Sequence, residues 1–153
     1  MAWVAGAAFF LAAPGARAGD VSLGLQGSWS EDFEYGVGAR LNLDLSDRRA
    51  GLAAAVTFDY FFPEAVFGVE PTYWELNGSL IYKLGDSNLQ PYVGTGLNLA
   101  HASVSVEGVG SASEDEIGVN LLGGVKLGRS LFGEVRYEIK GGEQLVISVG
   151  FLF

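Results

Sequence analysis

The residues best suited to catalysis are a histidine, a serine and a run of carboxylates. His101 is the only histidine of the chain, Ser103 lies two positions later, and Glu114, Asp115 and Glu116 follow. A carboxylate can orient a histidine so that it removes the proton of a serine hydroxyl, which prepares that serine for acyl transfer. An exposed loop histidine without a catalytic role is the alternative, and we favour that interpretation.

Acidic groups could also bind a divalent cation. Glu31–Asp32 and the run Ser113–Glu116 offer carboxylate oxygens, which Ca²⁺ and Mg²⁺ prefer. Their spacing matches no Ca²⁺-binding loop, so we interpret both as solvated acidic loops. The chain has no cysteine, which excludes thiolate metal sites, and its Gly-x-Gly pairs form no phosphate-binding motif. We therefore expect no metal and no cofactor.

The segments that carry these residues follow a period of two. Large apolar side chains alternate with polar or small ones in eight segments, and no helical period appears after residue 18. The segments are 21–29, 34–45, 52–60, 74–84, 93–99, 117–127, 131–139 and 145–153. Short polar turns follow the second, fourth and sixth segments, whereas the longest connections, Phe61–Thr72 and His101–Asp115, follow the third and fifth. This alternation is typical of an up-and-down β-barrel.

The small side chains of the polar face indicate which side lies inside the barrel. That face is rich in glycine, alanine and serine, not in the lysine and glutamate that coat soluble proteins. A soluble barrel would place its apolar residues inside. The large apolar residues therefore face lipid, and the chain has room for eight strands of about 9–11 residues but not for sixteen. The sequence predicts an all-β fold, an eight-stranded antiparallel up-and-down transmembrane β-barrel.

Residues 1–18 are predicted to be a signal peptide, and residues 19–153 the barrel domain. Trp3–Ala13 is apolar, Pro14-Gly15 breaks the stretch, and Ala16-Arg17-Ala18 has the pattern of a cleavage site. A buried N-terminal helix is the alternative, which the lack of a polar face disfavours. We expect export across the inner membrane of a Gram-negative cell to its outer membrane. The net charge of −9 argues against a nucleic-acid partner.

Aromatic residues gather near both ends of the segments, as expected at the two interfaces of a bilayer. Toward the long loops we predict a girdle of Trp29, Tyr35, Phe58, Tyr60, Trp74 and Tyr137. Toward the short turns we predict Tyr82, Tyr92, Phe132, Phe151 and Phe153. Packing of these rings in a core is the alternative.

Charged residues on the small-residue face would lie inside the barrel. They are Glu34, Arg40, Asp59, Glu75, Lys83, Glu116, Lys126, Glu134, Arg136 and Glu138. Because unpaired buried charges are costly, we predict a network of ion pairs that fills and closes the lumen. The alternative is a path for ions or small solutes, or a plug that rearranges.

Three stretches carry a family resemblance. They are Gln90–Ala100 (QPYVGTGLNLA), Gly133–Tyr137 (GEVRY) and the last strand, which ends on Phe153. They resemble the small outer-membrane β-barrel family that includes OmpX-like proteins and the transmembrane domain of OmpA. The resemblance implies that Phe151 and Phe153 belong to a signal read by the barrel-assembly machinery. We also expect contact with the lipid bilayer and lipopolysaccharide of the outer membrane, and a monomer.

The function predicted from these features is non-enzymatic: envelope structure, or surface interaction through the loops Phe61–Thr72 and His101–Asp115. The first alternative is a narrow channel for ions or small solutes. The second is a lipid A-modifying acyl hydrolase, because the pair His101-x-Ser103 resembles the lipid A 3-O-deacylase barrels. In those enzymes the pair lies near the chain end, whereas three predicted strands follow it here. We therefore rank the hydrolase last.

Overall fold

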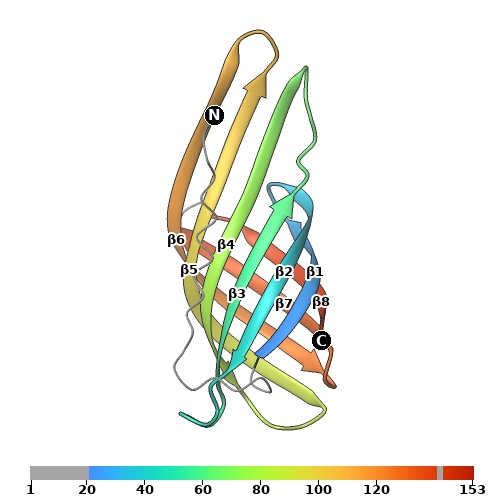
Figure 1. Ribbon diagram of the computed structural model, residues 1–153, viewed down its shortest axis with the longest axis vertical. Helices are drawn as coiled ribbons and strands as arrows, with labels where there is room; N and C mark the ends of the chain where they lie inside the picture. Colours follow the sequence, from blue (N-terminus) through green and yellow to red (C-terminus); the bar gives the residue numbers. More distant parts are fainter. Residues whose placement is uncertain (1–20, 141–142) are drawn as a thin grey trace.

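The described residues, 21–140 and 143–153, form one closed β-barrel in the computed structural model (Figure 1). The strands are β1 (Val21–Ser30), β2 (Glu34–Asp44), β3 (Leu52–Phe61), β4 (Val69–Lys83), β5 (Leu89–Val106), β6 (Gly110–Leu127), β7 (Leu131–Lys140) and β8 (Leu145–Leu152). Each strand is antiparallel to the next, and β8 pairs with β1. The predicted eight-stranded antiparallel barrel is confirmed.

The predicted signal peptide, residues 1–18, lies outside the described residues. Among those that are described, no helix is long and apolar enough to cross a membrane.

Alternating side chains give the barrel an apolar outside and a polar inside. On β5, Leu97 is 62% exposed, whereas its neighbour Asn98 is 1% exposed. On β8 the buried residues are Val146, Ser148, Gly150 and Leu152. Strand residues point alternately to the two faces of a sheet, so the period of two in the sequence separates these environments. Such an outer surface is stable in lipid, and closure pairs the backbone groups that lipid cannot solvate.

The last strand closes the barrel against the first. The paired residues run from Gly24 opposite Leu152 to Ser30 opposite Val146. Past the end of β8 the backbone continues this ladder, because the Phe153 N–H donates to the Leu23 carbonyl oxygen (2.7 Å) and the Leu23 N–H donates in return (3.1 Å). The final apolar segment of the sequence is therefore an integral strand of the barrel wall.

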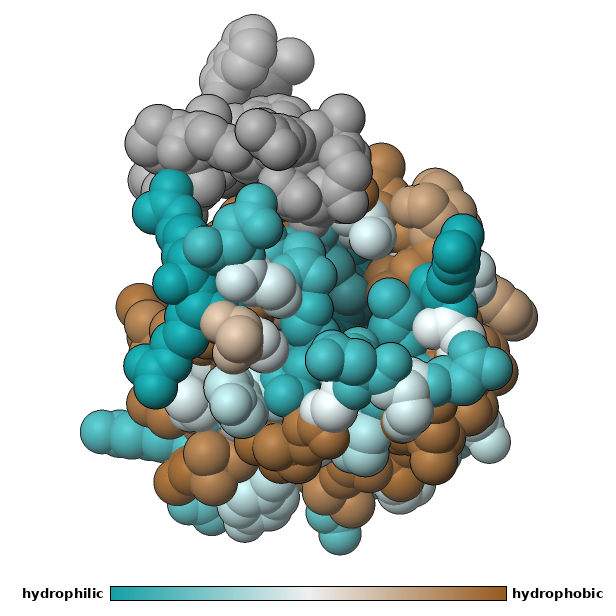
Figure 2. Space-filling model, turned by 90° about the horizontal axis from the view of Figure 1, so that it is seen from below, coloured by the Kyte–Doolittle hydropathy of each residue, from teal (hydrophilic) through white to brown (hydrophobic). Residues whose placement is uncertain are grey.

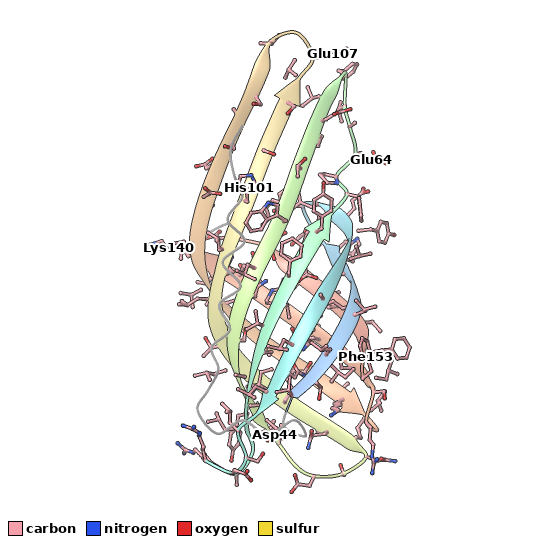
Figure 3. All side chains as sticks on the ribbon, viewed as in Figure 1. Asp44, Glu64, His101, Glu107, Lys140 and Phe153 are labelled. Carbon is pink, nitrogen blue, oxygen red and sulfur yellow. The ribbon has the colours of Figure 1, made fainter. Side chains whose placement is uncertain are left out.

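Short turns join the strands at one end of the barrel, which we term the turn end. They span residues 45–51, 84–88 and 128–130. The other connections lie at the opposite, loop end. Figure 3 shows Asp44 at the turn end and Glu107 at the loop end.

The prediction of two long loops is wrong in extent. β5 and β6 meet at a turn over residues 107–109, so most of His101–Asp115 is strand, and β4 begins at Val69, so the connection after β3 is reduced to residues 62–68. The physical reason is that alternation continues through these residues and each finds a cross-strand partner, up to the pair of Val106 with Gly110. Gly108, with a φ of 80°, adopts the left-handed conformation that this tight turn requires.

Extension of β4, β5 and β6 creates a three-stranded projection, the blade, which comprises residues 69–72 and 101–117. In Figure 1 these strands rise beyond the rest of the barrel. The neighbours stop earlier, because β3 pairs with β4 only as far as Tyr73 and β7 pairs with β6 only as far as Val119. Within the part of the chain that the structure describes, β6 thus has no second neighbouring strand along residues 110–117.

Two apolar clusters lie inside the barrel. The loop-side cluster comprises Phe61, Tyr73, Ala100 and Val146, with Phe33 packed against it. The turn-side cluster comprises Ala55, Ile81, Tyr92 and Leu122. The prediction that Tyr92 and Phe132 belong to the outer girdle is wrong, because both rings point inward and are buried. Gly124 leaves the space for one of them, since a Cβ there would collide with the Tyr92 ring.

Candidate functional site

An arginine and three carboxylates are buried together on the loop side of the lumen. The guanidinium of Arg136 on β7 lies 2.9 Å from Glu75 on β4, 3.3 Å from Glu138 on β7 and 3.5 Å from Asp59 on β3. Each of these side chains is at most 2% exposed. We call the group the Arg136 cluster. It contains three carboxylates and one guanidinium, so carboxylates are in excess.

Neutral side chains supply the other hydrogen bonds of these carboxylates. The bonds run from Tyr73 Oη to Glu75 Oε1 (2.6 Å), from Gln144 Nε2 to Glu75 Oε1 and to Glu138 Oε2 (3.2 Å), and from Gln26 Nε2 (2.7 Å) and Ser28 Oγ (2.9 Å) to Asp59 Oδ1. Hydrogen bonds to charged acceptors are stronger than those between neutral groups. The donors, which come from β1, β4 and the residue before β8, therefore tie distant strands together across the lumen.

A second buried arginine lies nearer the turn end and has a single carboxylate partner. Arg40 Nη1 of β2 donates to Glu134 Oε2 of β7 at 2.8 Å, and both side chains are 2% exposed. Tyr92 Oη also donates to Glu134 Oε2 (2.9 Å), and Arg40 Nε donates to Asn42 Oδ1 (2.8 Å). The guanidinium carbon lies 4.7 Å from the centre of the Phe132 ring, which adds a cation–π contact. We call this group the Arg40 cluster.

Glycine on β2 makes room for the Arg136 cluster. Gly38 pairs with Asp59 across β2 and β3. A Cβ at this position would collide with the Asp59 carboxylate and would lie 2.6 Å from the Phe58 carbonyl oxygen. The small residues of the inward face are therefore required by the charged groups that fill the narrow lumen.

The structure brings six of the ten predicted lumen charges together in these two clusters. They are Arg40, Asp59, Glu75, Glu134, Arg136 and Glu138. Lys83 instead pairs with Asp44 near the turn end (2.6 Å), where both are partly exposed. Lys126 is half-buried and lines a cavity at the turn end.

The prediction that Glu34 and Glu116 lie in the lumen network is wrong, because both are exposed. Glu34 is the first residue of β2, directly after the β1–β2 turn, and its φ is 60°. Glu116 lies on the blade, beyond the level at which β7 closes the wall. Position along the strand, and not the face alone, decides whether an inward residue is enclosed.

Tyr73 and Gln144, which donate hydrogen bonds to the Arg136 cluster, were not among the predicted lumen groups. Tyr73 is two positions before Glu75, and Gln144 is two positions before Val146, so both share an inward face with a predicted residue. Extending each period of two by one step beyond the apolar segment would have found them. Gln144 precedes β8 in a connection, which is why the sequence indicated a loop residue there.

The predicted girdle residues lie on the outer surface, where each is exposed or half-exposed: Trp29, Tyr35, Tyr60, Trp74, Tyr82 and Tyr137. Near the loop end they form cross-strand pairs, Trp29 with Tyr35 and Tyr60 with Trp74. Tyr82 lies near the turn end, as do the exposed rings of Phe151 and Phe153. Figure 3 shows the Phe153 side chain outside the barrel wall.

The residues considered for acyl transfer lie on the outer face of the blade at its base. His101 Nδ1 is 2.5 Å from Asp115 Oδ1 on the neighbouring strand. The Trp74 ring stacks on the imidazole, with centroids 5.1 Å apart and 21° between the ring planes. Ser103 lies two positions along β5 on the same face (Figure 3 labels His101). Asp115 can therefore orient the imidazole and leave its Nε2 for another partner.

The blade is acidic. It carries Glu70, Glu107, Glu114, Asp115 and Glu116 and contains no lysine or arginine. Among residues 21–140 and 143–153, however, no group of three or more histidine, cysteine, aspartate or glutamate side chains is arranged to hold a metal ion. The prediction that Ser113–Glu116 forms a loop is wrong, because these residues lie on β6, where they are exposed.

No family model matches the sequence, and no curated protein matches it. Among solved structures, the N-terminal β-barrel domain of Pseudomonas aeruginosa OprF is 17% identical, with a TM-score of 0.61 over 86% of this chain and 97% of that one. Neisserial surface protein A is 20% identical (TM-score 0.55, 86% and 91%). Ail, the attachment invasion locus protein of Yersinia pestis, is 14% identical (TM-score 0.50, 87% and 96%). The chain has the fold of the small eight-stranded outer-membrane barrels.

This likeness confirms the resemblance that three stretches of the sequence indicated. At these identities it establishes the fold and leaves function to the residues of this chain. The similarity extends over nearly the whole of each solved barrel, so the eight-stranded wall is the shared part. The groups that can act on other molecules are therefore best sought at the two ends of the barrel.

Proposed function

We propose that the protein is a non-enzymatic integral outer-membrane barrel that uses its blade to contact a basic partner outside the cell. The observation that carries this proposal is the extension of β4, β5 and β6 past the rest of the wall. Residues that served only to span the bilayer would not need strands of 18 residues, since about 9–11 suffice.

Cleavage after residue 18 would place the blade outside the cell and the short turns in the periplasm. Small barrels commonly have short periplasmic turns and longer external loops, which matches the two ends of this barrel. The apolar outer face would contact the bilayer and lipopolysaccharide. The barrel-assembly machinery would read the strand that contains Phe151 and Phe153, and the inserted protein would be a monomer.

The blade offers a partner both charge and apolar surface. Its five carboxylates, without a lysine or arginine, favour a basic partner and would steer its approach. On the inward face, Val104 and Val106 are exposed, and Val109 is exposed at the turn. The edge of β6 along residues 110–117, which pairs with no second strand of the described residues, also presents backbone groups that an added strand could use. Ail has been solved with the heparin analogue sucrose octasulfate; we expect no such polyanion to bind this acidic blade.

Charge-matched variants test the blade. Glu114→Gln with Glu116→Gln removes two charges from its inward face, and Asp47→Asn with Asp86→Asn removes two charges at the turn end. Detergent-solubilised protein would be passed over immobilised basic proteins in a surface plasmon resonance experiment. The blade variant should bind at least about tenfold more weakly, whereas the turn-end variant should bind normally. Equal binding by both variants would contradict the proposed role of the blade.

A shortened variant tests the shape of the blade independently of those charges. Replacing residues 103–113 by Asn-Gly joins Ala102 to Glu114, which already face each other across β5 and β6. The barrel below this pair should fold normally, as heat-modifiable gel migration would show. Loss of partner binding by this variant is expected, and retained binding would place the interaction elsewhere.

The filled lumen argues against the channel alternative. Both arginine clusters cross the lumen, and their side chains are almost fully buried. Protein in planar bilayers should therefore give no steady openings. A steady small conductance that disappears on blocking the lumen would favour the channel instead.

The pairing of His101 with Asp115 keeps the acyl hydrolase as a second candidate function. In that case His101 would take the proton of the Ser103 hydroxyl, whose oxygen would attack an acyl ester of lipid A at the outer leaflet. The ester C–O bond would break, the sugar hydroxyl would leave with that proton, and water would then hydrolyse the acyl-serine to a free fatty acid. Mass spectrometry of lipid A from cells that make the wild-type protein, Ser103→Ala or the same-face control Ser105→Ala would decide. Our proposal predicts identical lipid A in all three strains. Loss of an acyl chain with the wild type and the control, but not with Ser103→Ala, would support the hydrolase.

A further inference from the structure

A cavity opens at the turn end of the barrel. Figure 2 views this end directly and shows a hollow with hydrophilic walls inside a rim of hydrophobic residues. Its volume is about 220 Å³, and polar wall residues include Asn42, Lys83, Gln90 and Lys126. Arg40 lines the cavity where it meets the Arg40 cluster. The cavity is therefore a polar cup, closed toward the middle of the barrel by a buried ion pair.

Positive charge is concentrated in this cup. Arg40, Lys83 and Lys126 are three of the nine lysine and arginine residues in a chain with 18 acidic residues. Arg40 is paired with Glu134, and Lys83 is paired with Asp44, the only carboxylate among the described residues that line the cavity. The Lys126 ammonium forms no hydrogen bond or ion pair with any described residue. Within the part of the chain that the structure describes, one positive charge of the cup thus has no counter-charge.

The position of Lys126 on its strand directs this charge inward. Lys126 shares the inward face of β6 with Leu122 and Gly124, and it lies between Gln90 of β5 and Phe132 of β7. Its stem can pack along this wall while the ammonium remains in the aqueous cup.

Neutral groups beside the charge have hydrogen-bonding capacity to spare. Asn42 uses its Oδ1 to accept from Arg40 Nε, so its amide N–H groups have no partner among the described residues. Gln90 uses its Nε2 to donate to the Gly85 carbonyl oxygen, which leaves its Oε1 as an acceptor. A lysine and an amide donor suit an oxyanion, and the acceptor suits a hydroxyl or amine on the same molecule.

We propose that the turn-end cup binds a small organic oxyanion, a carboxylate or a phosphate ester, with Lys126 and Asn42 as its donors. Cavities for drug-sized ligands have volumes of about 300–1,000 Å³, so this one suits a smaller molecule. The buried Arg40–Glu134 pair ends the cup, and the bound molecule stays at the mouth. The proposal does not depend on the role of the blade, since the two features lie at opposite ends of the barrel.

Titration with simple anions tests the proposal. The full-length protein, purified in detergent, would be titrated with succinate, with glycerol 3-phosphate and with the neutral analogue succinamide. Calorimetry and the side-chain amide NMR signals of Asn42 and Gln90 would report binding. We expect at least one of the two anions to bind and succinamide not to bind. The anion with the higher affinity shows whether the site prefers a carboxylate or a phosphate. Failure of both anions to bind would overturn the proposal.

Two lysine variants separate a built site from general charge attraction. Lys126→Gln should weaken anion binding about tenfold, because one charge-assisted hydrogen bond is lost. Lys140→Gln makes the same change in net charge at the far end of β7 and should bind normally. Lys126→Arg should retain binding within a few-fold. Equal weakening by Lys126→Gln and Lys140→Gln, with both variants folded by gel migration, would overturn the site.

Discussion

Arg136 and Arg40 lie in the same lumen but face different numbers of carboxylates. Arg136 contacts three, on β3, β4 and β7, whereas Arg40 contacts one and rests against the ring of Phe132. The Arg40 pair is balanced in charge, and the Arg136 cluster is not. In a narrow lumen, balance allows an ion pair to be surrounded by aromatic residues, whereas excess negative charge has to be met by neutral donors from several strands.

The difference also concerns how far each cluster reaches around the barrel. The Arg40 cluster joins β2, β5 and β7, while the Arg136 cluster and its hydrogen-bond donors come from β1, β3, β4, β7 and the residue before β8. We therefore expect the Arg136 cluster to contribute more to the stability of the closed wall. Because the cluster has more carboxylates than cations, removal of one carboxylate should cost less stability than removal of Arg136.

The largest effect is expected from Arg136→Met. This change leaves three buried carboxylates without a cation, and we expect the free energy of unfolding to fall by about 5 kcal/mol. Urea unfolding of the barrel refolded in lipid vesicles would measure it. A loss no larger than that of Arg40→Met would remove the distinction between the clusters.

Arg40→Met should have the next largest effect. Only Glu134 loses its cation, and the Tyr92 hydroxyl continues to donate to it, so we expect a loss of about 3 kcal/mol in the same assay. Adding Glu134→Gln should recover most of this loss, because no buried charge then remains unpaired. Lack of recovery in the double variant would mean that packing of the arginine on Phe132, and not charge, is what matters.

Glu138→Gln should change stability by less than about 1 kcal/mol, in either direction. Arg136 keeps two carboxylates, and the new side-chain oxygen can still accept from Gln144. Glu134→Gln is the matched control, and it should be clearly destabilising because it leaves Arg40 without a carboxylate. Both variants would be unfolded in urea. Similar losses of unfolding free energy would show that the Arg136 cluster has no surplus acid.

Phe153→Ala, outside both clusters, should likewise have little effect on stability. The ring is 75% exposed on the lipid-facing side, and the backbone hydrogen bonds to Leu23 remain, so the unfolding free energy should change by about 1 kcal/mol or less. The amount of protein in the outer membrane should nevertheless fall several-fold if Phe153 belongs to an assembly signal. If the yield in the outer membrane falls only in proportion to the loss of stability, Phe153 is a girdle residue and not part of an assembly signal.

Local pattern was sufficient for the architecture. A period of two specifies strands and assigns each residue to a face, and eight such segments with three short turns specify the number and direction of the strands. The large apolar and small residues on opposite faces then specify lipid outside and lumen inside. These features depend on neighbours within a segment, so they can be predicted from the sequence, including the inward face of Arg136 and Arg40.

The same pattern was insufficient for the ends of the strands and for the rings at Tyr92 and Phe132. A long connection and a long hairpin have similar composition, and only cross-strand partners distinguish them, as residues 101–115 illustrate. An aromatic residue near a strand end suits a girdle or a core, and its face decides between them. The inward face of Tyr92 followed from its neighbours, but the space that accepts it is provided by Gly124 on the next strand.

By itself, the sequence determined that this chain forms an eight-stranded barrel and which residues could enter its lumen. Only the tertiary structure decided which charges meet. Arg136 and Glu75 are 61 positions apart, and Arg40 and Glu134 are 94 apart. Their heights in the lumen depend on strand tilt and register around the closed wall, which no segment encodes alone. Closure therefore left Lys126 without a charged partner among the described residues at the turn end and enclosed Arg136 among three acids.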